Sequence, residues 1–189
     1  MTKYIICLDA GHSYAKDTGG DPGAVNGEYN ESEAALSIVN RIGCKLAVLG
    51  HKVVYTRTGG KAKMALSERT TTSNEANADV FISIHLNASD NKSASGIETL
   101  RFSRVGNTTK SLAKLIQMNL VKATGFKDRG VKERDDLYVL KHTKAPAVLV
   151  EVGFISNDDE CKKLFSEHYQ EIISQQITDS TLKVLEGFI

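Results

Sequence analysis

The sequence predicts a single α/β domain built on a mostly parallel β-sheet. Short runs rich in β-branched residues alternate with longer segments of helical periodicity, which is typical of this fold class. The chain has 189 residues with neither a low-complexity linker nor an internal repeat, so one domain over residues 1–189 is expected. A chain of this size buries about 70% of the surface that its unfolded form exposes, and it needs neither disulfides nor metal merely to fold.

The N-terminal part predicts a strand, a long loop and a helix. The strand covers residues 4–8, and the glycine-rich segment 10–30 follows as a loop; long loops in compact domains are often functional. A helix then begins after Asn30, which forms a capping-box pattern with Glu33. An apolar stripe at spacings of three or four marks this helix before Gly50: Ala35, Val39, Ile42, Leu46 and Leu49.

The rest of the chain continues the alternation. Further strands are predicted over residues 52–56, 80–86, 96–102, 137–140 and 147–150. Helices are predicted over residues 65–78 and 108–124, and the segment after the last strand is helical, with a buried stripe that includes Ile173, Ile177 and Val184.

Composition and charge exclude several classes of function. Twenty-four basic residues against 23 acidic ones leave a formal charge of +1, so a nucleic acid partner is not expected. Cys7, Cys44 and Cys161 lie far apart, which argues against a disulfide framework and against a cysteine zinc site. The apolar run at the N-terminus ends at Asp9 and is too short for a signal peptide or a membrane span. Nothing in the sequence indicates a protein partner.

Reactive side chains occur where the predicted strands end. His12 follows the first strand by a few residues, His85 lies at the end of the strand 80–86, and Glu151 directly follows the strand 147–150. The glycine-rich loop adds Glu31 at the first turn of its helix. In open α/β sheets, ligands bind outside the carboxyl ends of the strands, so these four side chains are expected to converge.

Two histidines, one carboxylate ligand and a second carboxylate that removes a proton from water are what a hydrolytic zinc site requires. No H-E-x-x-H occurs, which excludes a zincin helix. Each residue also has a purely structural interpretation, because a histidine at a strand end is often simply hydrogen-bonded and Glu31 suits the positive end of a helix. The residues alone leave both interpretations open.

Two further residues are candidates for contact with substrate. His142 lies in the loop before Glu151, where it would line the same cleft. Asn87 is two residues past His85 and therefore shares its side of the strand, so that it would hydrogen-bond substrate or orient a ligand; a turn-initiating asparagine is the alternative. Serine catalysis is not expected, because no G-x-S-x-G is present.

Motifs along nearly the whole chain, in their order and spacing, resemble one known family. They are Leu8-Asp9-Ala10-Gly11-His12, Asp21-Pro22-Gly23-Ala24, Glu31, Thr56-Arg57, Arg69 ahead of Asn77-Ala78-Asp79, Ser83-Ile84-His85-Leu86-Asn87-Ala88, Gly96-Ile97-Glu98, Asp128-Arg129-Gly130-Val131-Lys132, and the run from Pro146 through Glu151 to Asn157. Together they resemble the zinc-dependent N-acetylmuramoyl-L-alanine amidases of the amidase type 3 family, which includes bacterial cell-wall hydrolases and phage endolysins.

The resemblance implies a catalytic domain with about six strands in a mixed sheet, flanked by helices, and close to the zinc-exopeptidase architecture. It implies one Zn²⁺ per chain held by His12, Glu31 and His85, with Glu151 as the catalytic carboxylate. Glu28 is a conceivable rival ligand, but the family places its ligand at the start of this helix, which favours Glu31. The implied reaction cleaves the amide between N-acetylmuramic acid and L-alanine in peptidoglycan.

Other functions remain as alternatives to this expectation. They are a non-catalytic muropeptide-binding domain, and a zinc peptidase that acts elsewhere on the stem peptide. Because no signal peptide is recognised, we expect the chain to be made in the cytoplasm and to act on the cell wall after release, as an endolysin does, or to be a domain trimmed from an exported protein.

Overall fold

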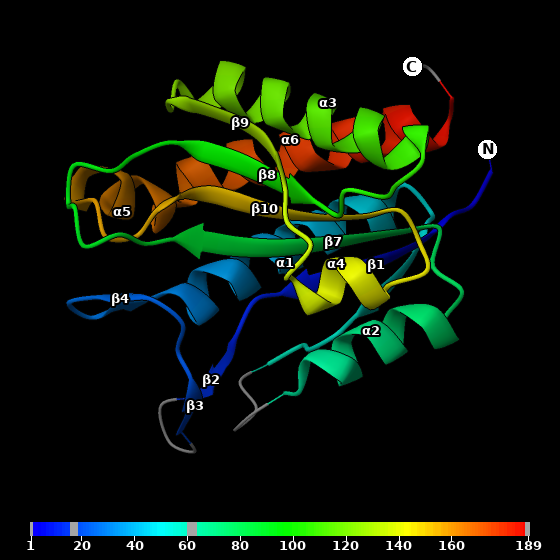
Figure 1. The fold of residues 1–189 in the computed structure, drawn as a ribbon, viewed down its shortest axis with the longest axis horizontal. Helices are drawn as coiled ribbons and strands as arrows, with labels where there is room; N and C mark the ends of the chain where they lie inside the picture. The colour runs from blue at the N-terminus through cyan, green and yellow to red at the C-terminus, as the bar shows by residue number, and fades with distance from the viewer. Residues whose placement is uncertain (1, 16–18, 60–63, 188–189) are drawn as a thin grey trace.

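A computed structural model describes residues 2–15, 19–59 and 64–187, and within them a six-stranded sheet forms the centre of the molecule (Figure 1). Its strand order is β6-β1-β7-β10-β8-β9. The strands are β1 (Ile5–Ala10), β6 (Lys52–Tyr55), β7 (Val80–Asn87), β8 (Ile97–Arg101), β9 (Asp128–Glu133) and β10 (Ala147–Phe154). Neighbours run parallel except β10 and β8, which are antiparallel. The predicted mixed, mostly parallel sheet is therefore confirmed.

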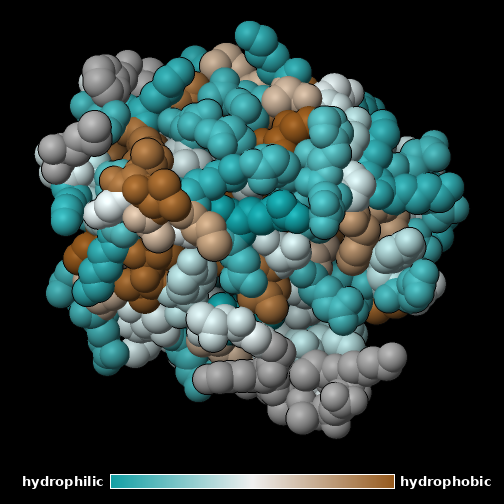
Figure 2. Space-filling view, turned by 180° about the vertical axis from the view of Figure 1, so that it is seen from behind, coloured by the Kyte–Doolittle hydropathy of each residue, from teal (hydrophilic) through white to brown (hydrophobic). Residues whose placement is uncertain are grey.

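Helices cover both faces of the sheet. On one side lie α1 (Glu31–Val48), α3 (Asn107–Thr124) and α6 (Glu167–Leu185), with α6 in contact with both α1 and α3. On the other side lie α2 (Leu66–Glu75) and α4 (Tyr138–His142) (Figure 1). The short helix α5 (Asp158–Leu164) follows β10. No helix among the described residues is long and apolar enough to cross a membrane. Seen from behind, the surface is mostly hydrophilic with scattered apolar patches (Figure 2).

The alternation of side chains along the strands decides where the site lies. Ile82 and Ile84 of β7 belong to the large core beneath α1, α3 and α6, whereas Phe81 belongs to the smaller core beneath α4. His85 is four residues past Phe81 and so lies on the same face, beyond the part of the sheet that packs on this smaller core. The carboxyl ends of β1, β7 and β10 therefore present polar side chains on the α2–α4 side.

The segment between β1 and α1 contains more structure than the predicted loop. Two small hairpins, β2 (Ser13–Ala15) with β3 (Gly19–Asp21) and β4 (Val25–Asn26) with β5 (Tyr29–Asn30), lead the chain into α1. Asn30 caps that helix, because its Oδ1 accepts a hydrogen bond from the amide of Glu33 at 3.0 Å. The predicted start of α1 is thus confirmed, and it places Glu31 at the first helical residue.

Three sequence predictions need correction. The strand predicted over residues 137–140 is instead the beginning of α4, because a short apolar run does not by itself distinguish a strand from a buried helix. Strand β9 was not predicted, since its sequence Asp-Arg-Gly-Val-Lys-Glu is polar and lies at the edge of the sheet. Strand β10 continues to Phe154 rather than ending at Val150, so that Glu151 lies within the strand.

Candidate metal centre

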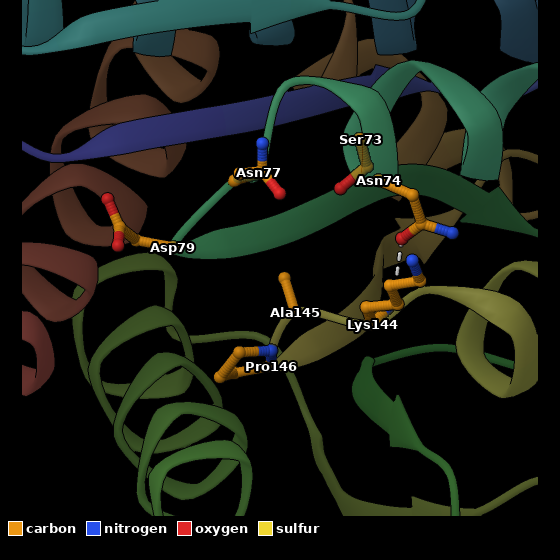
Figure 3. Close-up of a pocket in the computed structure, with 8 residues that line it drawn as sticks. Ser73, Asn74, Asn77, Asp79, Lys144, Ala145 and Pro146 are labelled. Carbon is orange, nitrogen blue, oxygen red and sulfur yellow. Dashed lines mark hydrogen bonds between the residues drawn. The ribbon is translucent and has the colours of Figure 1, made fainter.

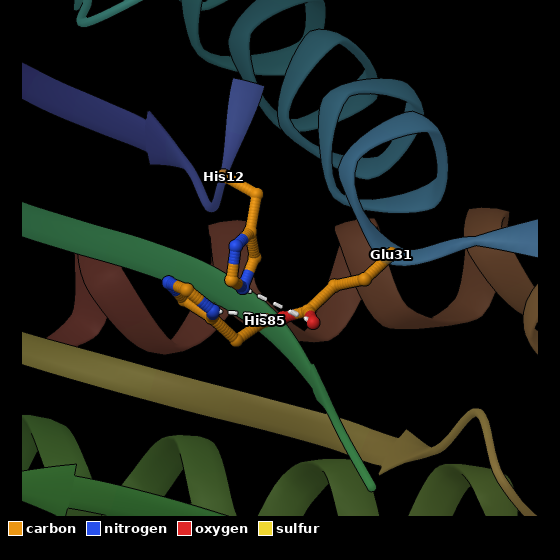
Figure 4. Close-up of side chains that lie close together, drawn as sticks. All are labelled: His12, Glu31 and His85. Atoms are coloured by element: carbon orange, nitrogen blue, oxygen red, sulfur yellow. Dashed lines mark hydrogen bonds and ion pairs between the residues drawn. The ribbon is translucent and has the colours of Figure 1, made fainter. Parts of the chain in front are cut away.

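His12, Glu31 and His85 come together at the carboxyl ends of β1 and β7 and the first residue of α1 (Figure 4). Their ligand atoms all lie within 4.8 Å of one another. Nε2 of His12 is 3.1 Å from Oε2 of Glu31, and Nδ1 of His85 is 2.8 Å from Oε1 of Glu31. Both imidazoles thus direct a nitrogen at one carboxylate, which is a compact donor set of two nitrogens and one carboxyl group.

Glu31 is held in place by main-chain groups as well as by the histidines. Its Oε1 accepts a hydrogen bond from the amide of Leu86 and its Oε2 accepts one from the amide of Ala24, both at 3.0 Å. The side chain is almost completely buried. Burial alone would raise the pKa of Glu31, but the hydrogen bonds and charges of His12 and His85 outweigh it and hold the pKa far below its usual range. Glu31 is therefore an ionised carboxylate fixed in orientation.

His12 adopts a backbone conformation with φ of 56°, which non-glycine residues rarely adopt. Its Nδ1 lies 2.8 Å from Oδ2 of Asp21, so that Nε2 is the nitrogen left to face Glu31. Burial would lower the pKa of His12, but Glu31 and Asp21 outweigh it and raise the pKa to about 9. Asp21 thus orients this imidazole as carboxylates do behind metal-bound histidines. This role of Asp21 could not be predicted from the sequence motifs.

Two buried arginines hold the backbone that carries His12. Nη2 of Arg57 donates to the carbonyl of Gly11 at 2.9 Å, and Arg69 donates to the carbonyls of Ala10 and His12 at 2.7 and 2.5 Å. Arg69 also forms a 2.6 Å ion pair with the buried Asp9. The positive φ of His12 is therefore stabilised by Arg57, which follows β6, and by Arg69 of α2.

Two glycines leave the space that the donor set occupies. A Cβ atom at Gly11 would lie 2.4 Å from Cε1 of His85, and a Cβ at Gly23 would lie 2.6 Å from Oε2 of Glu31. Gly23 in addition has a φ of +70°, a conformation that side chains disfavour. The backbone thus forms a close-fitting wall around the three side chains, and any side chain at either glycine would displace them.

Glu151 lies beside this cluster in the centre of the sheet. It is opposite His85 in the ladder between β10 and β7, and opposite Glu98 in the ladder between β10 and β8. Its Oε2 atom is buried and has no hydrogen-bond partner among the described residues. Burial, opposed by the charge of His85, raises the pKa of Glu151 to about 7. An unpaired carboxyl oxygen with a pKa near neutrality is suited to accepting and returning a proton.

A cleft of about 160 Å³ opens next to the donor set and is lined in part by His12, His85 and Tyr138.

A larger hollow of about 350 Å³ lies at the opposite ends of β7 and β10 and contains none of the predicted site residues (Figure 3). There the Asn74 side chain bonds the amide of Lys144 and the carbonyl of His142. The predicted metal ligands and Glu151 instead lie together at the carboxyl ends of the strands, as the sequence predicted.

The other predicted residues are placed as follows. The Asn87 amide donates to Oε1 of Glu98 at 3.0 Å and its Oδ1 accepts from the amide of Ala88, so it bridges β7 and β8 near Glu151. The exposed His142 ring stacks on Tyr138, with 4.0 Å between ring centroids, and is not among the residues that line the cleft. Glu28 is exposed in the turn between β4 and β5, away from the donor set. The substrate-binding roles of Asn87 and His142 stay predictions.

Comparison with known proteins agrees with this geometry. The family model described as N-acetylmuramoyl-L-alanine amidase matches residues 6–183. The chain is 36% identical over 178 residues to the N-acetylmuramoyl-L-alanine amidase LytC of Bacillus subtilis, covering 94% of this chain and 34% of that protein. It is 32% identical over 187 residues to the endolysin of Bacillus phage SPP1, covering 96% of this chain and 66% of that protein. The chain thus spans about a third of the first relative and about two thirds of the second.

Solved structures show the same fold. The crystal structure of an N-acetylmuramoyl-L-alanine amidase from Clostridium difficile 630 superposes with a TM-score of 0.91 at 31% identity, covering 99% of both chains. The catalytic domain of the amidase CwlV from Bacillus (Paenibacillus) polymyxa superposes with a TM-score of 0.87 at 31% identity, covering 98% of this chain and 99% of that domain. With the family model matching almost its full length, this chain belongs to the amidase type 3 family of N-acetylmuramoyl-L-alanine amidases.

Proposed function

We propose that this chain is a zinc-dependent amidase that hydrolyses the bond between N-acetylmuramic acid and L-alanine in peptidoglycan. Family membership supports the amidase activity and its substrate. The observation that carries the zinc dependence is the convergence of His12, Glu31 and His85 beside the unpaired Oε2 of Glu151. One Zn²⁺ per chain is proposed.

The residues present fit a zinc ion. Tetrahedral ligands about 2.0–2.2 Å from zinc lie roughly 3.4 Å from one another, and the donor atoms facing Glu31 are 3.1 and 2.8 Å from its two oxygens. Two imidazoles and one carboxylate are also a donor set that zinc prefers, with one coordination position open. Gly11 and Gly23 leave space for these three side chains, because a side chain on either glycine would collide with His85 or Glu31.

When bound, zinc supplies a Lewis acid that polarises the scissile carbonyl and lowers the pKa of water. Residues of the chain transfer the proton and position the proposed ligands. Glu151 accepts at Oε2 the proton of the attacking water and returns it to the nitrogen of L-alanine as the amide breaks. Asp21 holds His12 with Nε2 facing inward, and Arg57 and Arg69 hold the backbone on which His12 stands.

Product analysis tests the proposal against its alternatives. Purified peptidoglycan incubated with the zinc-loaded chain is expected to yield new N-terminal L-alanine. New termini elsewhere on the stem peptide would show a peptidase instead. Binding without any new terminus would show a non-catalytic muropeptide-binding domain.

We further propose that the described fold acts as one catalytic domain and reaches the cell wall after synthesis in the cytoplasm, by release as for an endolysin or by trimming from an exported protein. The similarity to the SPP1 endolysin supports the first route. Expression of the chain in a bacterial host, with and without a co-expressed holin, tests it. Lysis that requires the holin is expected, and lysis without it would contradict the endolysin route.

A further inference from the structure

Two basic side chains of β9 share a single carboxylate beside the catalytic residues. Glu98 of β8 is only 6% exposed. Its Oε2 lies 2.8 Å from Nε of Arg129 and 2.5 Å from Nζ of Lys132, while its Oε1 accepts the hydrogen bond from Asn87. Two cations against one buried carboxylate leave this corner of the site with one positive charge in excess.

This corner lies on the far side of Glu151 from the metal ligands. His85, Glu151 and Glu98 are directly opposite one another across β7, β10 and β8. Side chains in such a row point to the same face, and their Cα atoms are about 4.5–5.5 Å apart. A substrate whose scissile amide lies at Glu151 therefore has the donor set on one side and the cations of β9 on the other.

The two cations retain donors that the protein does not use. Arg129 bonds Glu98 through Nε and reaches the carbonyl of Ser95 through Nη1 at 3.5 Å, and its Nη2 has no partner among the described residues. Lys132 uses one of its three N–H groups. Their side chains are 29% and 42% exposed. The Phe154 ring, 4.8 Å from the guanidinium carbon, keeps Arg129 in place.

Two further carboxylates of this region, Asp128 and Glu160, accept hydrogen bonds from neutral groups rather than from Arg129 or Lys132. Arg134, the next basic residue of this segment, is bound bidentately by Asp136 through Nε and Nη2. Glu133 is paired with Arg101. Arg129 and Lys132 are thus two cations of β9 that lie at Glu98 and retain donors for a ligand.

An anionic group of the substrate that binds at Arg129 and Lys132 must come from the stem peptide. On the glycan side of the scissile bond the lactyl carboxyl is consumed in the amide, whereas the stem peptide carries carboxylates. We infer that Arg129 and Lys132 bind the α-carboxylate of the D-glutamate that follows L-alanine, and so select stem peptides in which this group is free rather than amidated. The inference rests on the proposed function, because it takes the scissile amide to lie at Glu151.

Binding of the leaving peptide tests the inference without requiring turnover. The probes are the tripeptide L-alanyl-γ-D-glutamyl-L-lysine and its counterpart with an amidated α-carboxyl group, titrated calorimetrically into the zinc-loaded chain. Charge-assisted hydrogen bonds are worth more than neutral ones, so the free carboxylate is expected to bind about tenfold more tightly. In Lys132→Met and in Arg129→Gln this ratio falls toward one. Lys110→Met, which removes an exposed lysine of α3, keeps the ratio of the unchanged chain.

Each outcome decides the matter. Equal affinities for the two peptides, no binding of either, or a ratio that survives both variants would overturn the inference. A loss of affinity for both peptides by the same factor would also overturn it, because the cations would then serve only to neutralise Glu98. Matching muramyl tripeptides separate the two proposals: hydrolysis without selectivity refutes only the carboxylate site, whereas selective binding without hydrolysis refutes the amidase activity.

Discussion

Glu151 of β10 lies directly opposite His85 of β7 in the parallel ladder that forms the centre of the sheet. The carboxylate proposed to transfer the proton and a proposed metal ligand are therefore positioned by the same strand register. A slip of one residue between these strands would turn one of the two side chains to the opposite face. The site is thus built into the central strands of the sheet rather than added on loops alone.

Replacing His85 by alanine is expected to remove most of the bound zinc. Two donors would remain, which is fewer than the three protein ligands of hydrolytic zinc sites. Zinc content per folded chain, measured by mass spectrometry after dialysis, checks this expectation. Full zinc occupancy in the His85→Ala chain would refute the ligand assignment. His168→Ala, at an exposed histidine of α6, is the matched control and should retain its zinc.

Glu151→Gln is expected to leave the fold and the zinc intact while hydrolysis falls by about 10²–10⁴-fold, the usual contribution of a general base. The amide is close in shape to the carboxyl group but does not accept the proton. Thermal melting, zinc content and release of N-terminal L-alanine are measured on the same preparation. If the variant is folded, zinc-loaded and nearly as active as the parent, Glu151 is not the base.

Gly11→Ala is expected to abolish zinc binding even though alanine is only one methyl group larger. The added Cβ would lie 2.4 Å from the His85 ring, which must then move away from Glu31. Gly59→Ala is the matched control, because no atom of the described residues, apart from its chain neighbours, lies within 4 Å of a Cβ at that position. Zinc titration followed by a competing chelator compares the two variants. Equal zinc affinities in both would contradict the close-fitting wall.

Zinc binding is expected to release protons and to tighten as the pH rises. The pKa of His12 in the metal-free chain is raised to about 9, so at pH 7 this imidazole is protonated and must lose its proton to bind metal. Affinity should therefore increase by up to tenfold per pH unit, for each proton released, until the pH reaches about 9. Calorimetry in buffers of different ionisation enthalpy counts these protons. A pH-independent affinity between pH 7 and 9 would show that His12 is neutral before metal arrives.

Asp9→Asn is expected to destabilise the fold by about 3–5 kcal/mol near neutral pH, because it leaves the buried Arg69 without its partner. Burial would raise the pKa of Asp9, but Arg69, Ser83 and Thr56 hold it below its usual value. A depressed pKa contributes stability above the unfolded value near 3.9, and this contribution is lost as the pH falls further. Urea unfolding between pH 6 and 3 should show a flatter acid dependence in the variant. An unchanged acid dependence would assign the effect to other carboxylates.

The sequence was sufficient where local patterns determine the structure. The predicted strands indicated that His85 and Glu151 lie close together near the carboxyl ends of the sheet, although both strands continue past these residues. The cap at Asn30 placed Glu31 on the first turn of α1. Asp21 and Arg69 belong to motifs of the resemblance, but their roles could not be predicted, since Asp21 acts through a turn in a glycine-rich segment and Arg69 through contacts with backbone some 60 residues away. Strand β9 was not predicted, because an edge strand with a polar sequence lacks the run of apolar residues by which the other strands were recognised.

The arginine contacts to the backbone of residues 10–12 make the proposed metal centre depend on an element that contributes no ligand. Arg69 belongs to α2, so the left-handed turn at His12 persists only while that helix is docked. Cleavage of the chain within α2 by a protease would therefore inactivate the enzyme with all of its ligands still covalently present. Local opening of α2, which hydrogen exchange of its amides would report, should accordingly provide a route by which the otherwise folded protein loses zinc.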